Sequence, residues 1–548
     1  MRFHLTLYKN CIWASILLAI FHILPGCSED ASPVTPASGR NITTFTLDEN
    51  AEGCLEKTGY VYNLSIVSNH ENNYKAEYQA GFIHGHLLKD LILSARDNLW
   101  DVASYVDPAH HTRPPALEEL DLAREILEQN YQYTTTTFFR KQAPLLQSRM
   151  LRLFFRLLGV YHGTKDAHPS ALDFSGNWVP TLDYFSDEEL ALGYETAAVT
   201  FLDVYFVNAF ADYLDAVEPT GPVQQRCTAF VYKADQDIFV AHNSWFIFLD
   251  QSMGLSYYIN GDFFTMNSVV PGMISSEASF GYNNKGIMYD ATTIAATHSE
   301  ARTDGLWMFW RETLAAQFAG SMDAFYDFIS LEASGTYMNS YMVVDVNETE
   351  IGLIEMSYDT FFYFKPDGSG GYDVITSKPG ISTAYDEEML QPDYILGFNY
   401  PVSIYLRDEL KAIENRPARR YQLLSMIHTV TDIEKAKNLI TYTFDPDEPL
   451  SIFGRWDLGY GWTPTPHIVP EGSIDAKATS ASMISYVSDI KGIVDIDSPY
   501  KMFWMKYGTP KINGKPFIWS ESIWKDQKLR NVPDVVDDNF YFLNLNIR

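Results

Sequence analysis

One cysteine occupies a position where its thiol could act as a nucleophile. Cys227 follows a chain-breaking segment at 219–222 (PTGP) and opens a run rich in β-branched and aromatic residues at 227–233 (CTAFVYK). A single break of the peptide bond before Cys227 would leave a thiol and a free α-amine on one residue at a sheet end. Because an α-amine titrates at roughly pH 7.7 to 8.0, part of it can accept the thiol proton at neutral pH. The structural alternative is that a cysteine at a strand start is commonly a small buried apolar residue.

A histidine in the next predicted strand comes close to this thiol in two of three hairpin registers. Residues 237–242 (DIFVAH) form the second strand. A two-residue loop places Cys227 opposite His242, whereas a four-residue loop places it opposite Ser244 with His242 on the same face. A three-residue loop turns His242 to the other face. The sequence leaves these registers open.

Other familiar catalytic signatures are absent from the sequence. It has no G-x-S-x-G nucleophile elbow, no G-x-x-x-x-G-K-[ST] phosphate loop, no G-x-G-x-x-G after a strand, no C-x-x-C and no H-E-x-x-H. His84 and His86 are two residues apart on a predicted helix, so they point in different directions, and packing is favoured over metal binding. We therefore expect no metal and no other cofactor.

The predicted secondary structure that must position these residues changes at residue 227 from mainly helices to strands. Before it, apolar residues recur at helical spacing in the segments 75–98, 117–130, 138–158 and 187–214. Gly81 and Gly85 in the first of these helices allow another element to pack closely. After it, the patterns predict a second hairpin near 282–286, a helix at 306–318, extended segments at 337–346, 350–356 and 361–365, and helices between 387 and 440. A mainly helical first part, then strands, then helices predicts a layered α+β domain.

The composition is that of an acidic globular protein. Hydrophobic residues make up 46% of the 548 residues, so the chain can bury enough apolar surface to exclude wholesale disorder. Acidic residues outnumber basic ones by 70 to 40, and the net charge of −30 repels phosphate backbones. We therefore expect no nucleic-acid partner.

The first residues are typical of a secretory signal. A basic start precedes a short apolar run at 11–24, and no later stretch is long and apolar enough to cross a bilayer as a helix. Residues 24–27 (LPGC) resemble a bacterial lipobox, which would make Cys27 the lipidated first residue of a tether at 27–43, behind a signal peptide at 1–26. Ordinary signal cleavage near the same point is the alternative. We expect export: to the cell envelope or periplasm in a bacterium, and to the outside or the lysosome in a eukaryote.

Several ordered motifs resemble the phospholipase B-like family of N-terminal nucleophile hydrolases. They are residues 227–229 (CTA), 241–245 (AHNSW), 271–276 (PGMISS), 292–293 (TT), 334–345 (SGTYMNSYMVVD), 454–458 (GRWDL) and 472–479 (GSIDAKAT). The resemblance implies a four-layer αββα sandwich of the α+β class. It also implies autocatalytic cleavage between Arg226 and Cys227, which would separate a helical N-terminal fragment at 44–226 from a catalytic fragment at 227–548.

The resemblance further implies roles for individual residues. Cys227 would be the nucleophile, with its new α-amine as general base, and His242 would orient or polarise the thiol. Asn339 would donate a hydrogen bond to the oxyanion. The other implied residues hold the acyl group or shape its pocket: Arg455, Thr293 and Trp245. Each also has a structural alternative, as a turn, an ion pair, a strand residue or part of the core.

The implied activity is hydrolysis of acyl ester or amide bonds through an acyl-enzyme on Cys227, and phospholipid deacylation is the leading interpretation. The substrate would be a lipid or an N-acyl small molecule. A related N-acyl amide hydrolase or acyltransferase is the close alternative. A catalytically silent surface protein that binds lipids or glycans is the rival from another class. The oligomeric state is left open.

Overall fold

Strands with two buried faces build the centre of this protein. The computed structural model describes residues 41–103, 114–169, 172–217, 227–247, 252–260, 263–275, 279–294, 300–414, 418–443, 451–454, 471–484, 501–511, 514–522, 525–526, 530–535 and 539–544. In β9 (Ile287–Thr293), Ile287 and Tyr289 pack into one apolar cluster, and Met288 packs into another. Because successive side chains of a strand point to opposite faces, one cluster lies under helices and the other between two sheets.

Sheet A is the larger sheet and contains eleven strands within the described ranges. In spatial order they are β1 (Asn41–Asp48), β2 (Ala51–Thr58), β3 (Val61–Ser68), β6 (Met253–Ile259), β7 (Phe263–Val269), β8 (Phe280–Asn283), β9, β10 (Asn339–Asp345), β11 (Glu350–Met356), β12 (Phe361–Pro366) and β13 (Tyr372–Thr376). Neighbouring strands are antiparallel, except that β3 and β6 pair in parallel. The chain before residue 227 and the chain after it therefore share one sheet.

Sheet B carries the predicted β-hairpin at its centre. Over the described part of the chain it contains seven antiparallel strands, in the order β14 (Leu390–Gln391), β15 (Tyr394–Gly397), β4 (Thr228–Lys233), β5 (Ile238–Ile247), β16 (Glu471–Ser480), β17 (Lys501–Tyr507) and β18 (Tyr541–Asn544). Strands β4 and β5 pack on β9 of sheet A. The hairpin is thus covered by the other sheet on one face.

Helices cover the outer faces of both sheets. They are α2 (Asn73–Ala103), α3 (Leu117–Gln132), α4 (Phe139–Lys141), α5 (Pro144–Thr164), α6 (Phe201–Asn208), α7 (Phe210–Val217), α8 (Met308–Phe318), α9 (Met322–Ile329), α10 (Ile404–Glu409), α11 (Ala418–Met426), α12 (Ile433–Ile440) and α13 (Ala481–Ile484). On sheet A, α2 packs on β2, β3 and β6, and α8 packs on β7 and β8. On sheet B, α12 packs on β5 and β16. The α+β fold class is confirmed.

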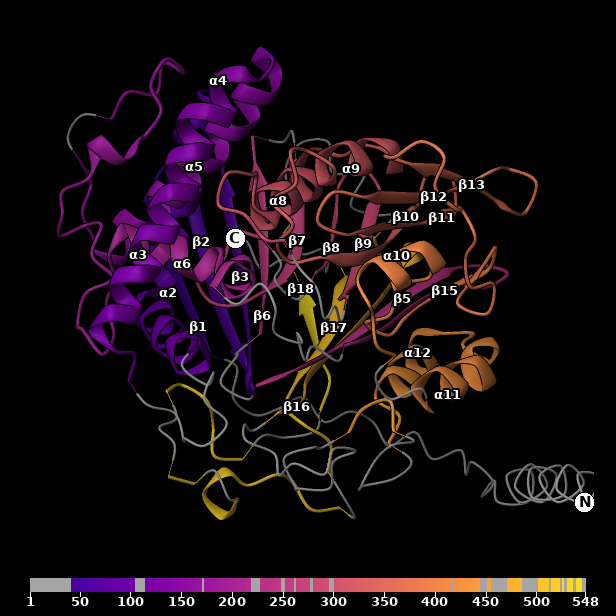
Figure 1. The fold of residues 1–548 in the computed structure, drawn as a ribbon. Helices are drawn as coiled ribbons and strands as arrows, with labels where there is room; N and C mark the ends of the chain where they lie inside the picture. The colour runs from indigo at the N-terminus through magenta and orange to yellow at the C-terminus, as the bar shows by residue number, and fades with distance from the viewer. Residues whose placement is uncertain are drawn as a thin grey trace, which may run out of the picture. The chain divides into compact units, whose positions relative to one another are not determined.

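Helices α2 and α5 lie side by side along much of their length (Figure 1). Four glycines, two from each helix, line their contact: Gly81, Gly85, Gly159 and Gly163. An added Cβ at any of them would meet backbone of the other helix at 2.0 to 2.2 Å. The expectation that Gly81 and Gly85 permit close packing is therefore confirmed.

Several other expectations need correction. The helix expected at 138–158 is divided, because Pro144, which lacks a backbone N–H, starts α5 as a new helix. The helix expected at 187–214 begins only at Phe201, where Thr200 and Asp203 form a capping box with contacts of 3.0 Å. Three strands, β1 to β3, lie in the part that was predicted to be mainly helical.

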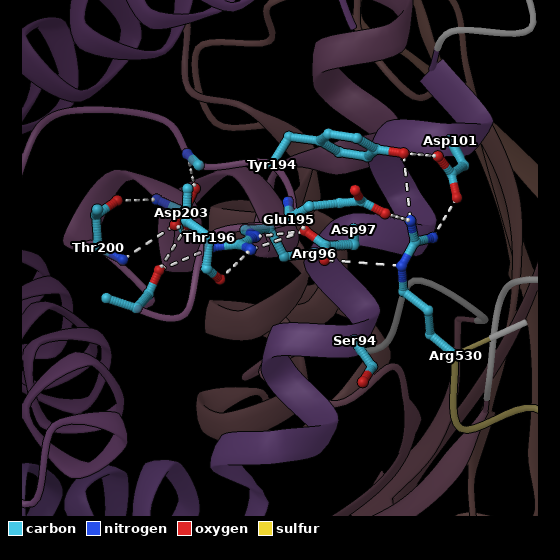
Figure 2. A network of polar contacts seen from close by, with 12 residues as sticks. Ser94, Arg96, Asp97, Asp101, Tyr194, Glu195, Thr196, Thr200, Asp203 and Arg530 are labelled. Carbon is cyan, nitrogen blue, oxygen red and sulfur yellow. Dashed lines mark hydrogen bonds and ion pairs between the residues drawn. The ribbon is translucent and has the colours of Figure 1, made fainter. Parts of the chain in front are cut away.

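A buried ion-pair network ties the last part of the chain to α2 (Figure 2). Arg530 pairs with Asp101 and, at 2.9 Å, with Glu195, and it lies 3.7 Å from Asp97. Asp97 also pairs with Arg96 at 2.8 Å. Removing one partner of a buried pair leaves an uncompensated charge, which is strongly destabilising. The network therefore holds the C-terminal segment against the helices that precede residue 227.

Within the described ranges, no helix has the length and apolar character needed to cross a membrane.

Candidate active site

The hairpin register puts Cys227 and His242 on the same face of sheet B. Thr228 pairs with Asn243 and Lys233 pairs with Ile238, which leaves a four-residue loop. Continuing this register by one residue places Cys227 opposite Ser244. His242, opposite Ala229, lies two residues further along the same face. Of the three registers considered from the sequence, the four-residue loop is confirmed.

The backbone of Cys227 is fixed by an arginine that was not anticipated. Arg419, fully buried on α11, donates to the Cys227 carbonyl at 2.6 Å and to the Thr228 hydroxyl at 3.0 Å. It also donates to the Phe398 carbonyl at 3.0 Å. Because the guanidinium is planar and rigid, donating to three acceptors holds them in a defined geometry. No sequence motif connected residue 419 with residue 227.

The thiol of Cys227 lies within protein although the residue is partly exposed. Burial raises the pKa of the Cys227 thiol to about 11. A hydrogen bond from the backbone of Trp245 and the charges of Lys477 and Arg419 oppose this rise, whereas Asp475 adds to it. In the intact chain the thiol is therefore protonated at neutral pH, and it needs a base to react.

His242 faces the interior between the two sheets. The residue is 1% exposed, and the backbone of Ala291 on β9 is a hydrogen-bonding neighbour of its ring. Burial, and next the charge of Lys477, hold the pKa of His242 well below its usual value. The ring is therefore neutral and can accept a hydrogen bond, but it is a weak base.

Asp290 lies on β9, the strand of sheet A on which the hairpin packs. Its side chain is fully buried, with the backbone of Ala291 as a hydrogen-bonding neighbour. Burial raises the pKa of Asp290 well above its usual value, although Lys477 opposes the rise. Asp290 is thus a neutral acid beside the same face. It belongs to a different sheet from Cys227, so no local sequence pattern connects the two residues.

Two charged side chains of β16 complete this face. Lys477 pairs across the sheet with His242, and Asp475 pairs with Ser244. The Lys477 ammonium lies 2.8 Å from an Asp475 carboxylate oxygen and 2.8 Å from the Ser244 hydroxyl, with no exposure to solvent. Both residues belong to the motif at 472–479, but no pattern in the sequence indicates a role for either of them.

Asn339 and Thr293 are brought together as cross-strand partners on β10 and β9. The Asn339 amide donates to the Tyr337 carbonyl at 3.0 Å and to the Tyr341 hydroxyl at 3.4 Å. The Thr293 carbonyl accepts a hydrogen bond of 2.7 Å from Asn399, which follows the Phe398 carbonyl that Arg419 holds. A continuous chain of contacts thus connects Asn339 with the backbone of Cys227.

Among the residues that the structure describes, the side chains of the remaining predicted site residues do not reach the Cys227 face. Trp245 is 2% exposed, and strand alternation turns its side chain to the face opposite Ser244. Its backbone N–H, rather than its indole, reaches the thiol. Arg226, Arg455 and Cys27 lie outside the described residues. His84 and His86 have separate partners, Tyr257 and Asp166.

Two carboxyl groups of α7 anchor the turn that leads to Asn339. Asp212 accepts from the Thr336 hydroxyl in this turn, and also from the backbone N–H groups of Met308 and Phe309 at 2.7 and 3.1 Å. Asp215 accepts from the backbone N–H of Tyr337 at 2.7 Å, and Tyr337 has a φ of 44°. Burial, and to a lesser degree Asp212, raise the pKa of Asp215 to about 7.

We expect Asp215→Asn to stabilise the protein at alkaline pH and not at acid pH. A raised folded-state pKa contributes stability below the ordinary value of 3.8, and this stability is lost as the pH rises towards about 7. The loss is up to about 4 kcal/mol, whereas Asn keeps an acceptor oxygen for Tyr337 and does not titrate. Thermal unfolding against pH measures it, with the exposed Asp183→Asn as control. Parallel curves for Asp215→Asn and wild type would contradict the prediction.

Comparisons with known proteins agree with the resemblance found in the sequence. The profile of the family described as Phospholipase B matches residues 52–543. Phospholipase B-like 1 of Rattus norvegicus is 23% identical over 67% of this chain and 69% of its own length. Phospholipase-B 81 of Drysdalia coronoides is 23% identical over 55% and 60%. Phospholipase B-like 1 of Bos taurus is 22% identical over 34% of this chain, and the match spans 44% of that relative's length. Because the family profile covers most of the sequence, this chain belongs to the phospholipase B family.

Proposed function

We propose that this chain is an exported, autoprocessed acyl hydrolase that deacylates phospholipids through the thiol of Cys227. The observation that carries the proposal is the position of Cys227 directly before β4, with its carbonyl fixed by Arg419 and with His242 on the same face. A break of the bond to Arg226 would leave this thiol and a new α-amine on a fixed chain end. Membership of the phospholipase B family favours a lipid ester as substrate.

In the proposed mechanism the new α-amine accepts the thiol proton, and the sulfur attacks the carbonyl carbon of the ester. The carbonyl electron pair moves to oxygen. To donate to this oxyanion, Asn339 would have to leave its 3.4 Å contact with Tyr341 on the helix-covered face of sheet A. One such donor contributes about 3 to 4 kcal/mol to the transition state. Collapse expels the lysolipid alkoxide, which takes the proton back from the α-ammonium. Water, deprotonated by the same amine, then cleaves the thioester and releases the fatty acid.

Other parts of the proposal concern the fold and the location. The order helices, sheet A, sheet B, helices supports an αββα N-terminal nucleophile hydrolase sandwich, with residues 44–226 and 227–548 as its two fragments. Arg455 would hold the acyl carbonyl, and Thr293 would line the pocket beside Asn339. The signal peptide at 1–26 and the lipid on Cys27 stay predictions.

The test compares phosphatidylcholine vesicles with an N-acyl amide as substrates of the purified protein. We expect fatty acid release from the phospholipid, a fragment whose first residue is Cys227, and an acylated form of that fragment after acid quenching. Release from the amide alone would reassign the substrate to N-acyl amides. An intact chain that hydrolyses neither substrate would contradict the proposal and favour a binding protein.

A further inference from the structure

A buried ammonium group is held next to the proposed nucleophile. Lys477 is fully buried, and its ammonium contacts the Ser244 hydroxyl and an Asp475 carboxylate oxygen, each at 2.8 Å. The same Asp475 oxygen accepts the backbone N–H of Ser244 at 3.0 Å. Since Ser244 lies opposite Cys227 in the hairpin register, these contacts fix a positive charge beside the thiol.

On the inner face of sheet B, the charges of the described residues beside Cys227 cancel while its thiol keeps the proton. On β16 the negative Asp475 offsets Lys477. His242 on β5 and Asp290 on β9 are both neutral, because burial disfavours their charged forms. A thiolate or an oxyanion at residue 227 would therefore add a negative charge to this face.

Among the residues that the structure describes, Lys477 is the cation on this face, and the buried Arg419 acts from α11 on the Cys227 carbonyl. The Ser244 hydroxyl provides the connection. A hydroxyl that accepts from an ammonium keeps one hydrogen of its own to donate, and the ammonium polarises that hydrogen. Opposite Ser244, this hydrogen can be donated to the residue at 227.

We propose that Lys477, held by Asp475 and acting through Ser244, is a positioning residue that stabilises negative charge on Cys227 during acyl transfer. The inference rests on the proposed function of Cys227 as nucleophile. Lys477 keeps its proton throughout, and the thiol proton still goes to the α-amine. No bond forms or breaks at Lys477, so its effect is electrostatic.

The decisive variant is Lys477→Met combined with Asp475→Asn. Removing Lys477 alone would leave Asp475 buried and unpaired, whereas the double variant removes a neutral pair and keeps an oxygen for the Ser244 backbone N–H. The readout is the rate at which iodoacetamide alkylates Cys227, followed across neutral and alkaline pH by mass spectrometry of its peptide. We expect the profile to move towards alkaline pH by about one unit and the rate at neutral pH to fall about tenfold.

A second buried lysine supplies the matched control. Lys437 is 7% exposed, pairs with Glu434 at 2.7 Å and lies 3.8 Å from the centre of the Trp504 ring, but it is not among the charges that act on Cys227. Lys437→Met with Glu434→Gln should leave the alkylation profile of Cys227 unchanged.

An unchanged alkylation profile in the Lys477 double variant overturns the proposal. If that variant does not fold, Ser244→Ala is measured instead, because it removes only the connecting hydroxyl: an alkaline shift supports the proposal and an unchanged profile overturns it. The alkylation assay contains no substrate. A Lys477-dependent profile in a protein that hydrolyses no lipid would therefore refute the proposed function and not this inference.

Discussion

Cys227→Ala is expected to leave the chain uncleaved and to abolish acyl hydrolysis. Under the proposed mechanism, residue 227 supplies the attacking sulfur in both reactions, and alanine has no group that can form a thioester. Loss of a covalent nucleophile typically lowers kcat by on the order of a millionfold. Intact mass and N-terminal analysis report cleavage, and fatty acid release from phosphatidylcholine reports hydrolysis.

The matched control is the other described cysteine. Cys54 is 8% exposed on β2 in sheet A, between β1 and β3, and not in the sheet that carries Cys227. Cys54→Ala should keep both cleavage and hydrolysis. A Cys227→Ala protein that is still cut before residue 227, or that still hydrolyses lipid at the wild-type rate, would remove the basis of the proposed mechanism.

The parts of the fold that the sequence predicts best are those set by local pattern. The helices at 75–98 and 117–130 and the hairpins after residues 227 and 282 occur as α2, α3, β4–β5 and β8–β9. Local pattern fails to predict the structure where a contact with a distant part of the chain determines the conformation. The stretch from 187 to 200 is apolar enough for a helix, but the Gly193 N–H donates to Asp203, whose carboxylate pairs with Arg96 of α2 at 3.1 Å.

The candidate site shows the same division. Cys227 and His242 are close in sequence, so hairpin geometry limits their relation to a few registers, and one of these is observed. Asp290, Arg419 and Lys477 come from β9, α11 and β16, which reach the site only through sheet packing and strand pairing. A single sequence does not reveal such long-range contacts. Once the fold is known, buried titratable residues of these types beside Cys227 become candidates for a functional role.

The contact between α2 and α5 should be intolerant of a single added methyl group. The Cβ of an alanine at position 81 would lie 2.1 Å from the Arg156 carbonyl oxygen and 3.0 Å from the Val160 nitrogen. These are backbone atoms, which cannot rotate away, so the two helices would have to separate. We expect Gly81→Ala to lower the free energy of unfolding by at least about 2 kcal/mol, because overpacking outweighs the gain of about 1 kcal/mol in helix propensity. Urea unfolding measures the loss.

Gly320→Ala is the matched control, because the same methyl group would there make only an ordinary contact of 3.4 Å with the Lys285 side chain. A surface substitution of this kind should change the free energy of unfolding by less than about 0.5 kcal/mol. Equal unfolding midpoints for Gly81→Ala and wild type would contradict the prediction. They would mean that α2 and α5 leave enough space at position 81 for an added methyl group. A large loss at position 81 alone would instead identify the close approach of α2 and α5 as a requirement of the fold, since α2 packs over the sheet that both parts of the chain build together.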